Sequence, residues 1–246
     1  MSHWTNELRD IRTVMWKERK GLLWSQGTRW RIALPLLSPL FIAIYLPWQA
    51  GSDWLEGYVS LLLCVAIPLL FVGISIPESF AGERERHTLP TLLASRLPDS
   101  AILLGKMFSC VGFSIVILLP ALLVGAVVAN SVAWRGSVAF YRPWVLLVDL
   151  GVALLVGGVI GSAGVLISLR SETVQGATQA LMGVFLVPPM ILAFVLMFFR
   201  DTLLPWLQGL GFASVLGCIL GALAVANGFL LFLALRRFRR ARLLLP

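Results

Sequence analysis

The sequence is short of charged side chains, which make up 13% of its 246 residues, whereas hydrophobic residues make up 59%. Soluble domains carry about 25% charged residues, so this chain has too little polar surface to coat a globule in water. Its two histidines, His3 and His87, lie far apart, which gives no support to a metal-dependent hydrolase. The three cysteines lie in separate apolar stretches, so we expect small core residues instead of a metal box or a disulfide framework.

Motifs for binding ATP or nucleic acid are missing as well. Gly105 and Lys106 are followed by Met107, and the upstream glycine of a Walker A loop is absent, so we expect no cofactor on this chain. The net charge of +8 does not predict a nucleic-acid partner, because the basic residues flank apolar stretches and are not interleaved with exposed aromatics. We expect them to set the topology and to attract anionic membrane lipids.

Long apolar runs dominate what is present. A hydrocarbon core of about 30 Å requires roughly 20 helical residues. Six stretches between charged residues are long enough: Ile32 to Ser52, Gly57 to Pro77, Met107 to Trp134, Leu150 to Leu169, Thr173 to Phe199 and Thr202 to Leu235. The sixth is too short for two crossings, so we expect its first eight residues to form an outer loop or a shallow re-entrant segment. The sequence thus predicts an all-α integral membrane protein with six transmembrane helices.

We expect a single domain over residues 1–246, with an interfacial helix and elbow at 1–31, a six-helix bundle at 32–235 and a basic tail at 236–246. Of the 20 basic residues, 17 lie in the N-terminal segment, the tail, and the loops after the second and fourth spans. Lys and Arg in short loops resist translocation. Both termini are therefore predicted to be cytoplasmic.

Residues 1–31 have the pattern of an amphipathic helix lying on the membrane. The apolar stripe consists of Trp4, Leu8, Ile11, Met15 and Leu22. The alternative is a cytoplasmic helix packed on a partner, and nearby tryptophans favour the interface.

Two features inside the spans bear on packing and chemistry. Gly157, Gly158, Gly161 and Gly164 let the fourth span approach its neighbours closely, and Gly217 and Gly221 have the same spacing in the sixth. We expect these glycines to serve packing within the chain more than a dimer seam. Asp149 is the one candidate for an intramembrane proton path, but its position one turn past Trp144 predicts that it faces the outer headgroup layer.

The segment from Glu78 to Lys106 is dense in charge and is predicted to be a cytoplasmic loop. Its alternating cluster is Glu83, Arg84, Glu85 and Arg86, and Leu89, Leu92 and Leu93 then follow on one face of a short predicted helix. Thr88 is placed to cap that helix, and Asp99 or Ser100 to cap the third span. A short amphipathic helix with no domain to pack on favours a groove on a partner. The alternative is a solvated loop that its charges keep out of the membrane.

This segment resembles the signature of the ABC transporter type-2 permease family, which reads roughly G-E-R-E-x-G-T-L-x-x-L-L-A-S-P and then L-G-K. The matching residues are Gly82, Glu83, Arg84, Glu85, Thr88, Leu89, Leu92, Leu93, Ala94, Ser95, Leu104, Gly105 and Lys106. His87 replaces the usual Gly, Arg96 the usual Pro, and Pro90 stands where an acid is common.

The resemblance implies the permease of an ATP-driven exporter in the plasma membrane of a prokaryote. Two such halves, here expected to be a homodimer, would work with two ATPase subunits that bind the ATP and Mg²⁺. Residues implied to couple to the ATPase are Glu83, Arg84, Glu85, Arg86, His87, Thr88, Leu89, Leu92 and Leu93, with Arg170 and Glu172 in the second short loop. The cargo is expected to be apolar, amphipathic or lipid-linked.

Two other functions stay open from the sequence. A membrane enzyme acting on lipids could use Glu83, Glu85, His87 and Asp99 at the inner interface. An assembly or sensing subunit could have the permease fold without transporting anything.

Overall fold

The computed structural model describes residues 9–18, 29–88, 97–134, 136–199 and 211–238, and its elements are helices. Residues 9–18 form a short helix. The chain continues through α2 (Arg29–Ala50), α3 (Asp53–Glu56), α4 (Leu61–Glu85), α6 (Asp99–Val132), α7 (Pro143–Ser168), α8 (Val174–Phe198) and α10 (Phe212–Arg237). The all-α prediction is therefore confirmed for the described residues.

Five of these helices, α4, α6, α7, α8 and α10, are long and apolar enough to cross a membrane. They correspond to the second to sixth predicted spans. The first predicted span falls on α2, where side chains are described from Leu37 onward and the run Leu37–Ala50 is apolar. Whether α2 crosses the membrane, which would bring the number of spans to six, stays a prediction. The elbow after residue 18 and the loop before α10 lie outside the described residues and also stay predictions.

The starts of the helices follow local chemistry. Pro143 occupies the first turn of α7, where its missing N–H has no intrahelical partner to lose. The Thr173 hydroxyl caps α8 by accepting from the Gly176 N–H at 3.1 Å. The predicted cap of the third span by Asp99 or Ser100 is wrong, because Pro98 is the capping residue of α6 and Asp99 begins the helix. Asp99 contributes a negative charge to the first turn instead.

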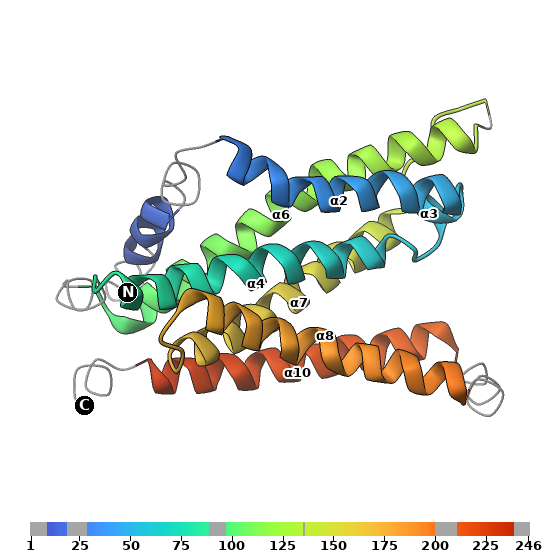
Figure 1. The fold of residues 1–246 in the computed structure, drawn as a ribbon. Coiled ribbons are helices and arrows are strands. Elements are labelled where there is room, and N and C mark those ends of the chain that lie inside the picture. The colour runs from blue at the N-terminus through green and yellow to red at the C-terminus, as the bar shows by residue number, and fades with distance from the viewer. Residues whose placement is uncertain (1–8, 19–28, 89–96, 135, 200–210, 239–246) are drawn as a thin grey trace.

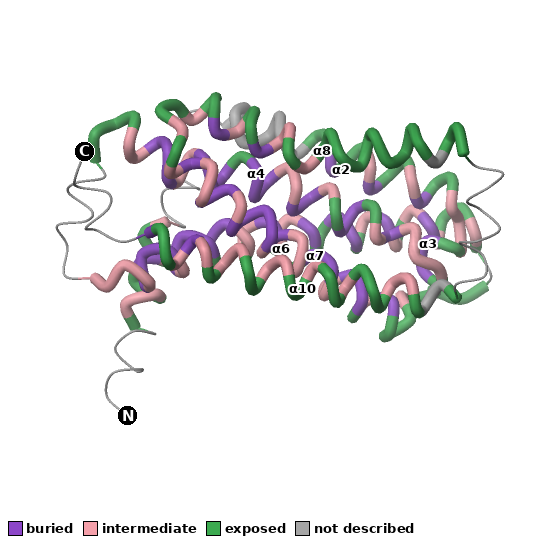
Figure 2. Tube along the Cα trace, turned by 90° about the horizontal axis from the view of Figure 1, so that it is seen from below, coloured by how far each residue is buried: buried purple, intermediate pink, exposed green. Residues whose placement is uncertain are grey.

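The helices lie roughly alongside one another, with α4 and α7 packed together at the centre (Figure 1). On one side α6 packs against both of them and carries α2 on its outer surface, while α8 and α10 lie on the other side. Buried residues gather on α4, α6 and α7, whereas α8 and α10 are mostly exposed (Figure 2). Exposed apolar faces of this kind suit a lipid environment.

Glycines of α7 permit the close central packing that the sequence predicted. A side chain at Gly164 would meet Ile76 at 2.8 Å and one at Gly161 would meet Met107 at 3.3 Å, while Gly158 lies directly against the Asn227 amide of α10. By contrast, a Cβ at Gly217 or Gly221 on α10 would have no atom of the described residues within 4 Å. The expectation of packing within the chain is therefore confirmed for α7 and wrong for α10.

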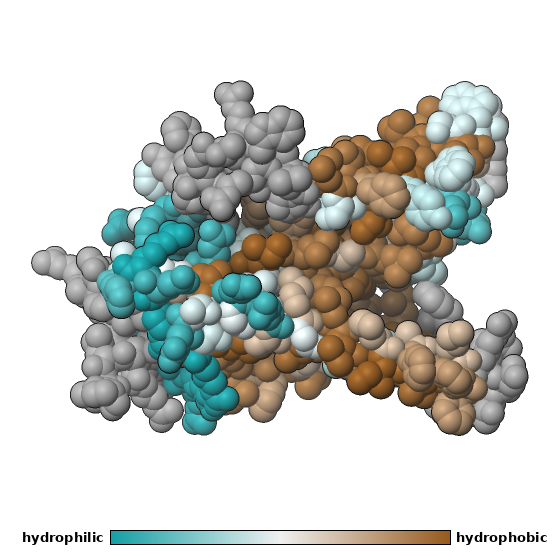
Figure 3. Space-filling view, viewed as in Figure 1, coloured by the Kyte–Doolittle hydropathy of each residue, from teal (hydrophilic) through white to brown (hydrophobic). Residues whose placement is uncertain are grey.

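Polar residues collect at one end of the bundle. We call this the charged end: the helix at 9–18, the C-terminal turns of α4 and α10, the first turns of α6, and residues 169–173 (Figure 3). The opposite end, called the α3 end, holds α3 and the described residues 133, 134 and 136–142 between α6 and α7. One buried apolar cluster, around Ile76, Phe80 and Met107, lies toward the charged end, and another, around Trp54 and Ile67, lies toward the α3 end.

Two expectations about buried residues need correction. Cys64 and Cys110 are buried as expected, but Cys218 is exposed on α10. Asp149 does not face the outer headgroup layer, because its side chain is fully buried inside the protein. Sequence position gave the depth of Asp149 along α7, but the direction in which its side chain points depends on how α7 packs against α4.

Candidate functional site

The charged cluster begins on a helix and not in a loop. The predicted second span ends at Pro77, but α4 continues without a break through Pro77 to Glu85. Glu83, Arg84 and Glu85 therefore occupy the last turn of α4, and their direction is fixed by that helix. Arg86 is its C-terminal cap. The expectation that this cluster lies in a loop is wrong, because the run from Glu78 to Glu85 contains good helix formers that extend the turn pattern.

Lys106 is the centre of the cluster at the charged end. Its side chain, on the second turn of α6, is 1% exposed. The ammonium Nζ lies 2.9 Å from Glu83 Oε1 and 3.3 Å from Glu18 Oε1. It also donates to the Ser79 carbonyl at 2.7 Å and lies 5.2 Å from the centre of the Phe80 ring. A buried ammonium needs such compensation, and these contacts provide two carboxylates, a carbonyl and an aromatic face.

The cluster joins three segments that are distant in sequence. Glu18 belongs to the helix at 9–18, Glu83 and Ser79 to α4, and Lys106 to α6. The Ser79 hydroxyl donates to Glu18 Oε2 at 3.2 Å, and the exposed Lys17 ammonium lies 3.6 Å from Glu83 Oε1. We call Glu18, Ser79, Glu83 and Lys106 the lysine clamp.

Apolar contacts bring the helix at 9–18 into the same place. Val14 is buried, and a side chain at Gly105 would come within 2.7 Å of the Val14 Cβ, so the glycine allows the two helices to touch. The side of this helix that faces the bundle carries Ile11, Val14 and Glu18. The predicted membrane-facing stripe included Ile11 and Met15 but missed Val14 and Glu18. Within residues 9–18, the face that contacts the bundle is therefore partly charged, and Trp16 is exposed.

A second set of contacts ties the end of α4 to the turn before α8. The Arg84 guanidinium donates to the Ser171 carbonyl at 3.4 Å, and the Val174 N–H donates to Glu85 Oε2 at 3.1 Å. Glu85 thus accepts from one of the free N–H groups at the start of α8, where the helix dipole favours a carboxylate. Neighbouring Arg170 and Glu172 are exposed. The two predicted coupling regions are in contact with each other.

The residue that follows the C-terminal cap of α4 has a left-handed backbone conformation. His87 has a φ of 55°, a conformation that glycine adopts most readily, and the resembling signature has glycine at this position. The Thr88 N–H and hydroxyl both reach the Glu83 carbonyl, at 2.8 and 3.2 Å. Arg86, His87 and Thr88 are exposed at this turn. Leu89, Leu92 and Leu93, with the short helix predicted to hold them, lie outside the described residues.

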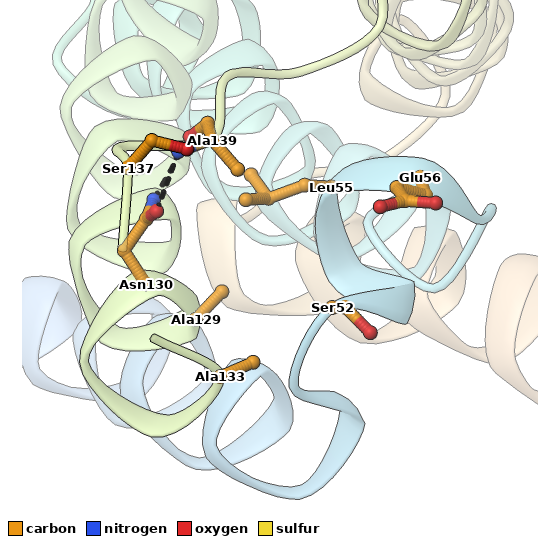
Figure 4. A pocket seen from close by; sticks show the side chains of 8 residues that line it. All are labelled: Ser52, Leu55, Glu56, Ala129, Asn130, Ala133, Ser137 and Ala139. Carbon is orange, nitrogen blue, oxygen red and sulfur yellow. Dashed lines mark hydrogen bonds between the residues drawn. The ribbon is translucent and has the colours of Figure 1, made fainter. Parts of the chain in front are cut away.

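The α3 end carries a small pocket of about 200 Å³ between α3, the end of α6 and residues 137–139 (Figure 4). Asn130 closes one side by accepting from the Ala139 N–H at 2.7 Å and donating to its carbonyl at 2.9 Å. Ligand sites for small molecules measure about 300–1,000 Å³. This pocket is too small to be the passage of a transported molecule.

Partly buried hydrogen bonds hold the same end together. The Trp54 indole N–H donates to the Tyr141 hydroxyl at 2.7 Å, and that hydroxyl donates to the Leu122 carbonyl at 3.0 Å. Burial raises the pKa of the Tyr141 phenol above its ordinary value, although the hydrogen bond from Trp54 acts in the opposite direction. At the surface, Arg142 pairs with Glu56 at 3.3 Å.

Among the described side chains, no group of three His, Cys, Asp or Glu residues could hold a metal ion. Of the four residues that a lipid enzyme would need, Glu83 is in the lysine clamp, Glu85 caps α8, His87 is exposed and Asp99 begins α6. Sequence reasoning missed Glu18 and Ser79 as partners of Lys106. The Lys106 position inside the L-G-K motif was the one signal that could have pointed to them.

The comparison with protein families agrees with the signature at the charged end. The model of the family described as ABC-2 type transporter matches residues 9–227, which is most of the chain. No curated protein matches the sequence. The match begins in the helix that contacts Lys106 and extends into α10, so it covers all the contacts described above. The chain is accordingly a multi-pass membrane protein of the ABC-2 type transporter family, a permease that serves as a transport subunit and not itself as an enzyme.

Proposed function

We propose that the chain is the membrane-spanning half of an ATP-driven exporter and that its charged end faces the cytoplasm, where it docks on ATPase subunits. Family membership implies ATPase partners in general. The charge distribution supports the orientation, because Arg84, Arg170 and Arg236 all lie at the charged end, where short connections retain Lys and Arg on the cytoplasmic side.

The lysine clamp is the observation that carries the coupling proposal. Through Lys106 it fixes the last turn of α4 to α6 and to the helix at 9–18. A force on the segment between α4 and α6 therefore acts on three elements together. Arg84 and Glu85 extend this connection to the start of α8. An ATPase that moves this segment would in this way move most of the bundle, which is the requirement for transmitting an ATP-driven step.

The residues implied for ATPase contact divide into two groups. Arg86, His87 and Thr88, with Arg170 and Glu172, are exposed and available to a partner. Glu83 is engaged with Lys106, and Arg84 and Glu85 hold the turn before α8. We assign the first group to docking and the second to transmission within the permease.

The complete transporter would contain two copies of this chain and two ATPases, each binding ATP with Mg²⁺. The proposed location is the plasma membrane of a prokaryote, with six spans and both termini in the cytoplasm. An apolar, amphipathic or lipid-linked cargo is supported by the apolar side chains that fill the space between α4, α6 and α7. Asp149 is the buried acid of this interior, which also holds buried serines such as Ser75, Ser114 and Ser162, and its burial inside the protein places it away from the lipid-facing surface.

The test is to purify the tagged chain in mild detergent and compare Arg86→Gln with the matched control Arg142→Gln, which lies exposed at the α3 end. We expect an ATPase with a Walker A sequence to copurify in equal amount with the wild type. Arg86→Gln should weaken this association, and Arg142→Gln should not. In Lys106→Met the ATPase should stay bound and still hydrolyse ATP, but hydrolysis should no longer move the helices of the permease. If no such ATPase accompanies the wild type, or if Arg142→Gln releases it, the proposal is wrong.

A further inference from the structure

Asp149 is a buried carboxylate for which the proposed transport path provides no role. It lies on the second turn of α7, about 9 Å from the start of that helix at 1.5 Å per residue, and its side chain is fully buried. The Ser60 hydroxyl and the Cys64 thiol of α4 are its polar neighbours. The two carboxylate oxygens of Asp149 and the Ser60 hydroxyl form no hydrogen bond with any of the described residues.

The described neighbours of Asp149 carry no positive charge. The titratable groups near it are the Cys64 thiol from α4 and the Tyr141 phenol from the segment before α7. Arg142 is the next residue in the chain, but it is exposed and paired with Glu56 at 3.3 Å. The start of α4 offers a partial positive charge. Its first N–H groups are already bonded to backbone carbonyls, however, as Leu61 is to Tyr58.

An unpaired ionised carboxylate is strongly disfavoured in such an interior. A metal cation is an unsuitable counterion here, because hard cations require about six oxygen ligands and the described residues supply two from Asp149 and one from Ser60. The remaining neighbours belong to the apolar cluster around Trp54 and Ile67. A single proton requires no further ligands, and it would allow the carboxyl group to donate to Ser60 after a small side-chain rotation.

We infer that Asp149 and Ser60 form a proton-binding site between α7 and the start of α4. When the α3 end is closed, the carboxyl group carries one proton and donates it in a hydrogen bond to the Ser60 hydroxyl. When α4 and α7 separate at the α3 end, water enters, the O–H bond of the carboxyl group breaks, and the proton passes to that water. Closure reverses the step. The link to transport rests on the proposed function, whereas the proton on Asp149 does not.

The first test is infrared difference spectroscopy of the purified full chain in lipid nanodiscs, without ATPase, after a step from neutral to alkaline buffer. The wild type should show a protonated carboxyl C=O band, Asp149→Asn should lose it, and Ser60→Ala should shift it because the hydrogen bond is removed. Asp53→Asn is the matched control, since Asp53 is an exposed acid in α3 at the same end of the bundle. It should leave the band unchanged.

A second measurement keeps the inference testable if the spectra are weak. Because Asn resembles a protonated Asp, the unfolding temperature of Asp149→Asn should equal that of the wild type in neutral buffer. In alkaline buffer the wild type should lose more stability than the variant. A wild-type carboxylate in neutral buffer, or a band that persists in Asp149→Asn, would overturn the inference, as would a band that disappears only when sodium is added. Failure of the ATPase to bind would affect the proposed function alone.

Discussion

Replacement of Lys106 by Met tests whether the lysine clamp holds the charged end together. Methionine has nearly the same length as lysine, so the apolar packing against Phe80 is largely kept while the positive charge is removed. The change leaves the carboxylates of Glu83 and Glu18, which are 18% and 14% exposed, facing each other without their shared cation. The protein should therefore become less stable.

The expected loss follows from the burial of the pair. Removing one partner of a buried ion pair costs about 3–5 kcal/mol, and the partial exposure of both glutamates favours the lower value. For a chain of this length each kcal/mol lowers the unfolding temperature by about 2–4 °C, so a fall of roughly 6–12 °C is expected. Thermal unfolding in detergent can be followed by labelling of the buried thiols of Cys64 and Cys110, with Cys218→Ser as the background because Cys218 is exposed.

Lys17→Met is the matched control, because Lys17 pairs with the same carboxylate of Glu83 at 3.6 Å but is 59% exposed. Exposed pairs contribute less than about 1 kcal/mol, so this variant should unfold within roughly 4 °C of the wild type. Equal shifts for Lys17→Met and Lys106→Met would refute the reasoning from burial. A further variant, Lys106→Met with both glutamates changed to glutamine, should recover much of the loss.

Two further substitutions test the contacts at each end. Gly105→Leu should displace the helix at 9–18, because the new side chain would overlap Val14, and hydrogen exchange of residues 9–18 should become faster. Tyr141→Phe should lower the free energy of unfolding by about 1–3 kcal/mol, because the buried indole N–H of Trp54 loses its acceptor.

Each of these substitutions has a control within the chain. Gly112 lies on the same helix as Gly105, and a Cβ added there would have no atom of the described residues within 4 Å, so Gly112→Leu should leave exchange at residues 9–18 unchanged. Tyr45 is exposed and accepts a hydrogen bond from Gln49 at 2.8 Å, so Tyr45→Phe should have little effect on unfolding. If Gly112→Leu speeds exchange as much as Gly105→Leu does, the contact with Val14 is not the cause. If Tyr45→Phe lowers the free energy of unfolding as much as Tyr141→Phe does, the hydrogen bond from Trp54 is not the cause.

The sequence was sufficient to predict the helical class and the position of most spans, since apolar runs of this length have few other solutions in a membrane. The glycines of α7 were also interpretable, because small residues at helical spacing permit close approach. The family signature identified the end of the bundle where Glu83 and Lys106 lie. Each of these predictions depends on local pattern alone.

Other features depend on contacts between distant segments. Glu78 to Glu85 look like a loop by charge, yet they contain helix formers that continue α4, and on this helix Glu83 pairs with Lys106 and Glu85 accepts from the start of α8. The same pairing turns Glu18 toward the bundle, although the apolar stripe of its helix suggested a membrane-facing surface. Likewise, the burial of Asp149 follows from the packing of α7 against α4. The periodicity of the sequence does not show which distant residues these side chains contact.

Photo-crosslinking in native membranes tests whether the charged end docks on an ATPase. A photoreactive amino acid is placed at Arg86, and the same group is placed at Arg142 for comparison. Both residues are exposed, and Arg86 is the C-terminal cap of α4 at the charged end whereas Arg142 is the N-terminal cap of α7 at the α3 end. The probe at Arg86 should capture an ATPase with a Walker A sequence, and the probe at Arg142 should not. Capture of the ATPase from Arg142, or from neither position while the transporter is assembled, would contradict the assignment of the charged end as the site of coupling.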